Sequence, residues 1–196
     1  YNQKYPEILF NGLKEKNFIK DDDLKYIKEG DLQTISTRTD FLGVNYYSRA
    51  VVRNEEVDES INSTKNVEMG PKTDFGWEVH PPGIYDLIMR LHKDYNVIDI
   101  IITENGCSYG DSPDQNNKIN DINRINYHDS HISQVLKAVA DGAPCTGYFA
   151  WSLMDNFEWA EGYSQRFGLI WVDFKTLERI PKESYYWYKN FLSSMK

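Results

Sequence analysis

Three short apolar segments separated by two amphipathic ones constrain the fold of this chain more than any other feature. The apolar segments cover residues 41–47, 97–103 and 146–153, and each has the length and the aromatic or β-branched content of a strand. Residues 84–95 and 122–139 instead carry apolar side chains at the three- and four-residue spacing of a helix. The order strand, helix, strand, helix, strand predicts an α/β fold with a parallel sheet.

Flanking residues and further segments complete this prediction. Asp121 can cap the second helix, and Gly142 follows its last turn. Residues 167–174 alternate in a way that predicts an extra strand or hairpin, and residues 184–193 have the spacing of a closing helix. Near the start, three consecutive Asp residues favour a helix over 21–27 because they complement its dipole.

Length and composition limit the possible classes of protein. The 196 residues are enough for one domain with a core, whereas a complete α/β barrel has about 250 residues. Three parallel strands alone would leave both sheet edges unpaired. The net charge of -8, with 22 Lys and Arg against 30 Asp and Glu, argues against a nucleic-acid partner. The mean hydropathy of -0.63 argues against a membrane protein, as does the lack of an apolar run near about 20 residues.

Neither the cysteines nor the histidines form a disulfide or metal-binding pattern. Cys107 and Cys145 are isolated from each other, so we expect both to fill space. Four histidines are expected to be structural or surface groups: His80, His92, His128 and His131. Residues 53–73 are polar and aperiodic, which predicts a long loop or a loose hairpin. The first residues do not resemble a signal peptide, so we expect a cytoplasmic location.

Candidate functional residues follow the predicted strands, since functional groups of parallel α/β proteins collect at the carboxyl ends. The second strand runs into Glu104, within a Thr-Glu-Asn-Gly sequence that by itself also fits a turn acid or a helix cap. The first strand ends in Asn45, Tyr46 and Tyr47, and alternation places Asn45 and Tyr47 on one face. A Tyr47 hydroxyl near a carboxylate would hold it ionised and oriented. Alternatively, Tyr47 is a core aromatic.

The third strand leads into residues 151–159, Trp-Ser-Leu-Met-Asp-Asn-Phe-Glu-Trp, which also fit two packed indoles and a solvated loop acid. Together, these three strand ends and the Arg-Phe-Gly-Leu sequence at 166–169 closely resemble glycoside hydrolase family 1, the β-glucosidase family. The resemblance covers nearly the whole chain, including 76–78, 82–87 and 185–188. It implies a (β/α)8 TIM barrel, with the three strands corresponding to barrel strands 6 to 8. Residues 1–196 would form the C-terminal part of that single catalytic domain, with the N-terminal part absent from this chain.

The resemblance also implies a role for each site residue. Glu104 would be the nucleophile of a retaining β-glycosidase and would form a covalent glycosyl-enzyme. Tyr47 would hydrogen-bond and orient Glu104. Six residues would bind the substrate. Asn45 would support the sugar and the tyrosine, Trp77 would lie on the leaving-group side, and Trp151 would form a platform for the sugar ring. Glu158 and Trp159 would hydrogen-bond sugar hydroxyls, and Phe167 would form an apolar wall. The implied mechanism requires neither cofactor nor metal.

The expected substrate is a terminal, unphosphorylated β-D-glucosyl residue. Relatives that act on 6-phosphorylated sugars place small polar and cationic side chains around the sixth carbon, whereas this chain has Glu158, Gln165 and Phe167 at those positions. A carboxylate would repel a phosphate in a desolvated site. The resemblance therefore predicts a β-glucosidase specificity.

One required part is missing from the sequence. A retaining glycosidase needs a second carboxyl group as general acid and base, and the family supplies it from an Asn-Glu-Pro segment of the fourth strand. Residues 54–56, Asn-Glu-Glu, resemble that segment only superficially. We therefore expect a complementary N-terminal barrel fragment as partner and no activity from the isolated chain.

Two alternatives remain open. One is a non-catalytic, family-like module that binds carbohydrate or protein, although an intact Tyr47 and Glu104 argue against the loss of catalysis. The other is a thioglucosidase, whose good leaving group dispenses with a protein acid. In thioglucosidases the pair corresponding to Glu158 and Trp159 usually differs, so this alternative ranks below the β-glucosidase.

Overall fold

The computed structural model describes residues 28–35, 37–52, 69–95 and 97–195. The helix expected over 21–27, the Asn-Glu-Glu sequence at 54–56 and most of the polar segment 53–73 lie outside the described residues. A short helix that the sequence pattern did not predict, α2 (Asp31–Ile35), precedes the first strand.

The three expected strands form one parallel sheet. Its strands are β1 (Leu42–Asn45), β2 (Ile100–Asn105) and β3 (Cys145–Ala150), in the order β1-β2-β3. The prediction of a parallel sheet is therefore confirmed. β2 starts and ends later than expected. Its end lies at Asn105 because Glu104 still pairs with Asn45 on one side and Asn105 with Ala150 on the other.

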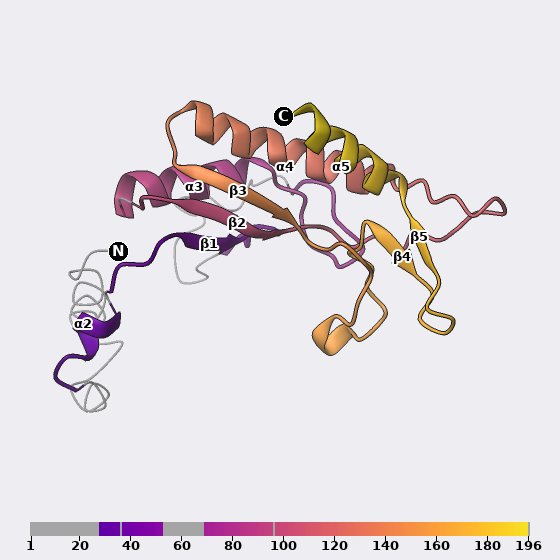
Figure 1. Cartoon of the computed structure of the whole chain (residues 1–196), viewed down its shortest axis with the longest axis horizontal. Helices are drawn as coiled ribbons and strands as arrows, with labels where there is room; N and C mark the ends of the chain where they lie inside the picture. The colour runs from indigo at the N-terminus through magenta and orange to yellow at the C-terminus, as the bar shows by residue number, and fades with distance from the viewer. Residues whose placement is uncertain (1–27, 36, 53–68, 96, 196) are drawn as a thin grey trace, which may run out of the picture.

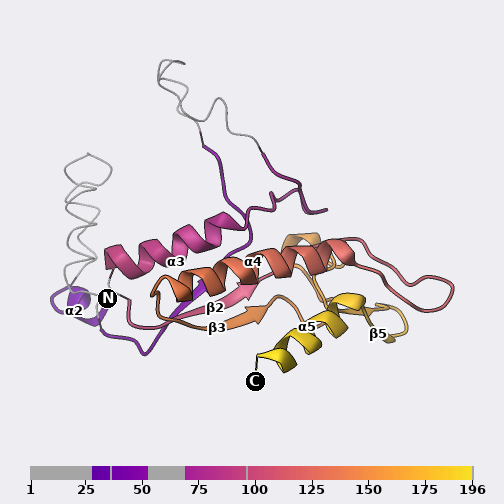
Figure 2. The ribbon, with the colours of Figure 1, turned by 90° about the horizontal axis from the view of Figure 1, so that it is seen from above.

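Helices cover one face of this sheet. α3 (Pro82–Tyr95) connects β1 to β2, and α4 (Ile122–Ala140) connects β2 to β3. Both run along the same face, and α5 (Glu183–Ser194) packs on α4 (Figures 1 and 2). The core between sheet and helices is made of buried apolar side chains, which include Val44, Ile84, Ile88, Ile100, Ile102, Val135 and Ala138. Burial of this apolar surface holds the elements together.

The opposite face of the sheet carries no helix of the described chain (Figure 1). Gly43 and Asn45 of β1 are exposed there, and Phe149 of β3 keeps 61% of its surface exposed. Parallel sheets in complete α/β proteins are usually covered on both faces. The described residues therefore build a core on one side of the sheet and leave the other side accessible.

An extra residue near the end of β2 decides which way Glu104 points. Val44 pairs with Ile102, but the next residue of β1, Asn45, pairs with Glu104, so β2 contains a β-bulge at this point. Strict alternation after Ile100 and Ile102 would turn Glu104 under the helices. The bulge instead places it beside Asn45 on the uncovered face, and alternation resumes with the buried Asn105.

The C-terminal part forms a hairpin and the closing helix. β4 (Ile170–Val172) pairs antiparallel with β5 (Arg179–Pro181), which confirms the hairpin expected after residue 167. A single 3-10 turn, η3 (Trp159–Glu161), interrupts the long loop between β3 and β4. No helix of the described residues is both long enough and apolar enough to cross a bilayer.

Candidate active site at the carboxyl ends of the strands

The Tyr47 hydroxyl donates a hydrogen bond of 2.6 Å to Oε2 of Glu104. Glu104 reaches this position from β2 through the bulge, and Tyr47 follows the end of β1. Burial, together with the adjacent Glu104 carboxylate, raises the pKa of Tyr47 well above its usual value. The phenol therefore stays protonated at neutral pH and can act as a hydrogen-bond donor to the carboxylate.

A second carboxylate, Glu158, lies on the same side of the sheet, in the loop after β3. Burial raises the pKa of Glu158 and the nearby negative charge of Glu104 raises it further, while a hydrogen bond from the Trp151 side chain opposes this shift. Trp151 itself follows β3, and its backbone N–H donates to the Asn105 carbonyl at 2.8 Å. Glu104, Tyr47, Trp151 and Glu158 are therefore brought together.

Tyr47 belongs to a cluster of four aromatic rings. The Tyr47 ring lies 5.2 Å from Trp77 and 6.1 Å from Phe167, and the Phe75 ring lies 4.2 Å from Trp77 in a tilted arrangement. Phe167 is only 2% exposed. In the described chain its ring contacts those of Tyr47 and Trp77, and its expected role as an apolar wall of the sugar site stays a prediction.

An ion pair holds the segment that carries Trp77. The buried Glu78 carboxylate accepts hydrogen bonds from Nε of Arg49 at 2.7 Å and from the Gly70 N–H at 2.7 Å. The Arg49 guanidinium lowers the pKa of Glu78 to about 2. Because Arg49 follows β1, this contact ties the Trp77 segment to the strand that supplies Tyr47.

Asn45 and Trp159 differ in how much they contact the rest of the described chain. Oδ1 of Asn45 accepts a hydrogen bond from the Thr103 hydroxyl at 2.7 Å, which ties Asn45 to β2. Trp159 begins the η3 turn and is 85% exposed. Its indole therefore makes little contact with the described chain and remains accessible to a ligand or to another part of the protein.

Two glycines permit close backbone contacts beneath the site. A Cβ on Gly106 would lie 1.8 Å from the Trp151 carbonyl oxygen, and one on Gly168 would lie 2.1 Å from the Asp155 nitrogen. Any larger residue would displace the loop that carries Trp151. The peptide bond between Trp151 and Ser152 is cis.

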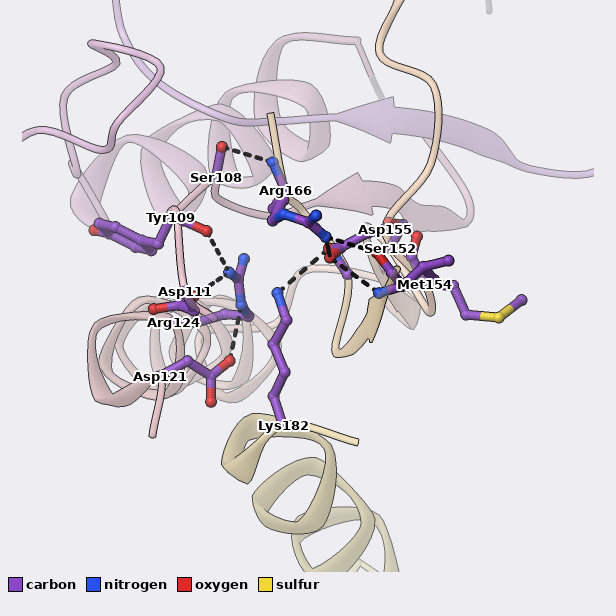
Figure 3. Close-up of polar contacts among 12 residues, drawn as sticks. Ser108, Tyr109, Asp111, Asp121, Arg124, Ser152, Met154, Asp155, Arg166 and Lys182 are labelled. Carbon is purple, nitrogen blue, oxygen red and sulfur yellow. Dashed lines mark hydrogen bonds and ion pairs between the residues drawn. The ribbon is translucent and has the colours of Figure 1, made fainter. Parts of the chain in front are cut away.

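The loop after β3 is held by Asp155, a buried carboxylate that the sequence reasoning did not select. Asp155 accepts hydrogen bonds from Arg166 Nη1 at 2.5 Å and the Gly168 N–H at 2.9 Å. Nζ of Lys182, which is buried before α5, lies 3.3 Å from Oδ1 of Asp155, the oxygen that also accepts from Gly168 (Figure 3). Burial lowers the pKa of Lys182 to about 8. These contacts fix the loop between Trp151 and Glu158.

A second buried network surrounds Arg124 of α4 (Figure 3). Its guanidinium pairs with Asp121 at 2.9 Å and Asp111 at 2.7 Å, and it donates to the carbonyl of Cys107. Asp121 also accepts from the Ser184 hydroxyl at 2.5 Å. Asp121 stands at the N-cap position of α4, but its side chain makes no capping bond. The expected capping role was therefore wrong, because Arg124 and Ser184 take the carboxylate.

No local sequence signal identifies these two networks. Arg124 and Lys182 occur in an amphipathic helix and a hairpin exit, where charged residues are usually exposed. Their burial depends on contacts between α4, α5 and the β3–β4 loop, which are distant in sequence. Among the residues that the structure describes, no group of three or more His, Cys, Asp or Glu side chains could hold a metal ion.

The fold and site define a class of protein: an α/β chain with a tyrosine-bound glutamate at a strand end, close to a second carboxylate and to several indoles, of which that of Trp159 is exposed. Comparison with known proteins gives the family. The profile of glycosyl hydrolase family 1 matches residues 1–196, so the chain belongs to this family. The family resemblance of the strand-end motifs is therefore confirmed.

The relatives differ in the activities their names state. The chain is 40% identical over 197 residues to a 1,4-beta-D-glucan glucohydrolase of Thermotoga neapolitana, covering 99% of this chain and 42% of the relative. It is 42% identical to a 6-phospho-beta-galactosidase of Staphylococcus epidermidis, covering 90% of this chain and 41% of the relative. The chain thus spans about two fifths of the length of these relatives.

A solved structure gives the same result for the fold. The beta-glucosidase of Thermotoga maritima in complex with castanospermine superposes with a TM-score of 0.81 at 40% identity, covering 98% of this chain and 42% of that chain. The described strands and helices are therefore a part of the family 1 TIM-barrel structure. The assignment of these strands to barrel positions 6 to 8 stays a prediction.

Proposed function

We propose that this chain is the C-terminal part of a retaining β-glucosidase in which Glu104 is the nucleophile. The observation that carries the proposal is the 2.6 Å hydrogen bond from Tyr47 to Glu104 on the uncovered face of the sheet. A carboxylate held this way is oriented, as a nucleophile must be. Family membership supports the same role.

The proposed reaction has two steps. Oε1 of Glu104 attacks the anomeric carbon while the glycosidic C–O bond breaks and the leaving oxygen receives a proton from the general acid. Water, deprotonated by the same group acting as base, then hydrolyses the glycosyl ester with net retention. Tyr47 holds Oε2 of Glu104 during both steps.

The general acid is proposed to come from an N-terminal barrel segment outside these 196 residues. In a retaining enzyme the two carboxyl groups are about 5 to 5.5 Å apart. Glu158 is not assigned this role, because its carboxylate is engaged by Trp151 and is proposed to accept hydrogen bonds from sugar hydroxyls. The complementary segment would cover the open face of the sheet.

We propose an unphosphorylated β-D-glucoside as substrate. Glu158 would face the sugar hydroxyls together with the exposed indole of Trp159, and Trp151 would support the sugar ring. A phosphate at the sixth carbon would meet the Glu158 carboxylate in a partly desolvated site. Because one relative is named a 6-phospho-beta-galactosidase, the rates with phosphorylated and unphosphorylated glycosides are to be compared directly.

The test uses the chain as the C-terminal part of one polypeptide whose N-terminal part comes from the Thermotoga maritima beta-glucosidase, called here the assembled enzyme. It is expected to hydrolyse an aryl β-glucoside, whereas the free chain is not. A 2-deoxy-2-fluoroglucoside should label the peptide that contains Glu104. Glu104→Gln should lower kcat by several orders of magnitude, and Glu178→Gln in the hairpin loop should not.

Three outcomes would contradict the proposal. One is substantial hydrolysis by the free chain, which would remove the need for a second segment. Another is a clear preference for 6-phosphorylated glycosides, which would overturn the role of Glu158. The third is a folded assembled enzyme that binds castanospermine without turnover or labelling, which would favour a non-catalytic binding module.

A further inference from the structure

The side chain of Asn105, directly after Glu104, is fully buried on the helix-covered side of the sheet and makes three hydrogen bonds. Its Nδ2 donates to the Tyr46 carbonyl at 2.7 Å and to the Tyr127 hydroxyl at 3.1 Å. Its Oδ1 accepts from the Tyr148 hydroxyl at 2.7 Å. The residue that follows β1, together with β3 and α4, is therefore bonded to the residue beside the proposed nucleophile.

The donors and acceptors in this network allow one arrangement of protons. The Tyr46 carbonyl can only accept, which fixes the Asn105 amide with Nδ2 toward it. Tyr148 must then donate to Oδ1 of Asn105, so it accepts from Nδ1 of His128 at 3.0 Å. Tyr127 accepts from Asn105 and is left with its own proton to donate.

That remaining proton connects the network to Tyr47. The Tyr127 hydroxyl donates to the backbone carbonyl of Tyr47 at 2.9 Å. The Tyr46 N–H donates to the Glu104 carbonyl at 2.9 Å. Tyr127 and Asn105 thus hold the backbone on both sides of the 2.6 Å bond between Tyr47 and Glu104.

We propose that Tyr127, acting through Asn105 and the Tyr47 carbonyl, is a positioning residue that sets the hydrogen bond between Tyr47 and Glu104. The inference deepens the proposed function and rests on it, because it assumes that Glu104 is the nucleophile. Tyr127 lies on α4, on the opposite side of the sheet from the site, and does not touch the substrate.

The bulge in β2 explains why such a support is needed. The ladder between β1 and β2 is irregular where Asn45 pairs with Glu104, so regular strand pairing alone does not hold Glu104. Buried hydrogen bonds in a low-dielectric interior are strong and strongly directional. The tyrosine network therefore supplies the rigidity that the interrupted ladder lacks.

The experiment measures kcat, KM and the pH dependence of kcat/KM for the assembled enzyme and its Tyr127→Phe variant. We expect kcat to fall about tenfold with KM nearly unchanged, since a small misplacement of reacting groups costs rate. The acidic limb of the pH profile should move to higher pH, because a carboxylate with a weaker donated hydrogen bond protonates more readily. The titratable groups near Glu104 in the described chain, Tyr47 and Glu158, are unchanged in the variant.

Tyr85→Phe is the matched control. The Tyr85 hydroxyl also bonds across helices, to Asp141 at 2.7 Å, but it has no contact with the site. The control should lower Tm without moving kcat or the acidic limb. If Tyr127→Phe does not fold, Tyr148→Phe tests the other end of the network and should show the same kcat loss and limb shift to a smaller degree.

Glu104→Gln, measured in parallel, separates the two hypotheses. If Glu104→Gln retains hydrolysis, the proposed function fails. If Glu104→Gln is inactive while Tyr127→Phe keeps the kcat and pH profile of the unaltered enzyme, only the positioning role is overturned. The positioning role is equally overturned if Tyr85→Phe reproduces the kinetic change, since the effect would then follow loss of stability.

Discussion

The two faces of the β1-β2-β3 sheet differ in what their side chains contact. On the covered face, Ile100 and Ile102 are fully buried under α3 and α4. On the uncovered face, Glu104 is bonded to Tyr47, and Phe149 is largely exposed. Burial of apolar side chains on the covered face stabilises the described chain. The side chains on the uncovered face remain accessible to a ligand or to another part of the protein.

Within one strand, β2, a single bulge separates residues that stabilise the core from a residue of the proposed site. Before the bulge, Ile100 and Ile102 face the core; after it, Glu104 faces the open side and Asn105 faces the core. Asn105 is tolerated in the core because its polar atoms are all bonded. The proposed site is therefore built on the core and not on a separate loop.

Truncation of the covered face is expected to have the largest effect on stability. Ile102→Ala removes a fully buried side chain and should lower the free energy of unfolding by about 2–5 kcal/mol, because Ile102 is 0% exposed. Urea unfolding of the 196-residue chain measures the loss.

Phe149→Ala is the control on the uncovered face. It should cost about 0.5 kcal/mol or less in the free chain, and more in the assembled enzyme, where the rest of the barrel would cover it. Equal losses for Ile102→Ala and Phe149→Ala in the free chain would contradict the difference between the faces.

Loss of the tyrosine hydroxyl on the uncovered face should affect rate and spare stability. Tyr47→Phe in the assembled enzyme should lower kcat/KM by about 100-fold, the effect of removing one preorganised hydrogen-bond donor to the reacting carboxylate. The change in Tm should be small, and steady-state kinetics with an aryl β-glucoside measures the rate. A kcat/KM equal to that of the unaltered enzyme would show that Tyr47 does not support the nucleophile.

Acidification should lower the free energy of unfolding, because two histidines are buried on the covered face. Burial lowers the pKa of His128 to about 3, and the nearby Arg124 contributes; burial also lowers the pKa of His131 to about 4. Below an unfolded-state pKa of about 6.5 the unfolded chain binds protons that the folded chain does not, so stability falls as pH decreases. The slope should be at most about 1.4 kcal/mol per pH unit for each histidine.

Urea unfolding of the free chain at pH values from about 7 to about 4 measures this slope. The His131→Asn variant should retain a smaller dependence, since one of the two titrating groups is gone. A free energy of unfolding that stays constant over this range would mean that the two histidines are not held neutral by the fold.

The order of the elements and the residues at the strand ends could be predicted from local sequence patterns. Apolar periodicity and flanking glycines are local signals, so the three strands, the helices between them and the final hairpin were all predictable. The strand-end motifs were likewise continuous in sequence, which is why Glu104 and Tyr47 were selected and why the family was recognised. The short helix α2 had no such periodic signal.

The face of the sheet that each of these residues occupies, and the contacts that support it, depend on how the elements pack. The bulge that turns Glu104 outward depends on pairing with two neighbouring strands, and no pattern within β2 encodes it. The burial of Phe167, and of Asp155 with Lys182, depends on elements that are far apart in the chain. Side-chain type and spacing are local properties, whereas burial and partner choice arise only when distant segments pack, and for that reason the support of the site became visible only in the fold.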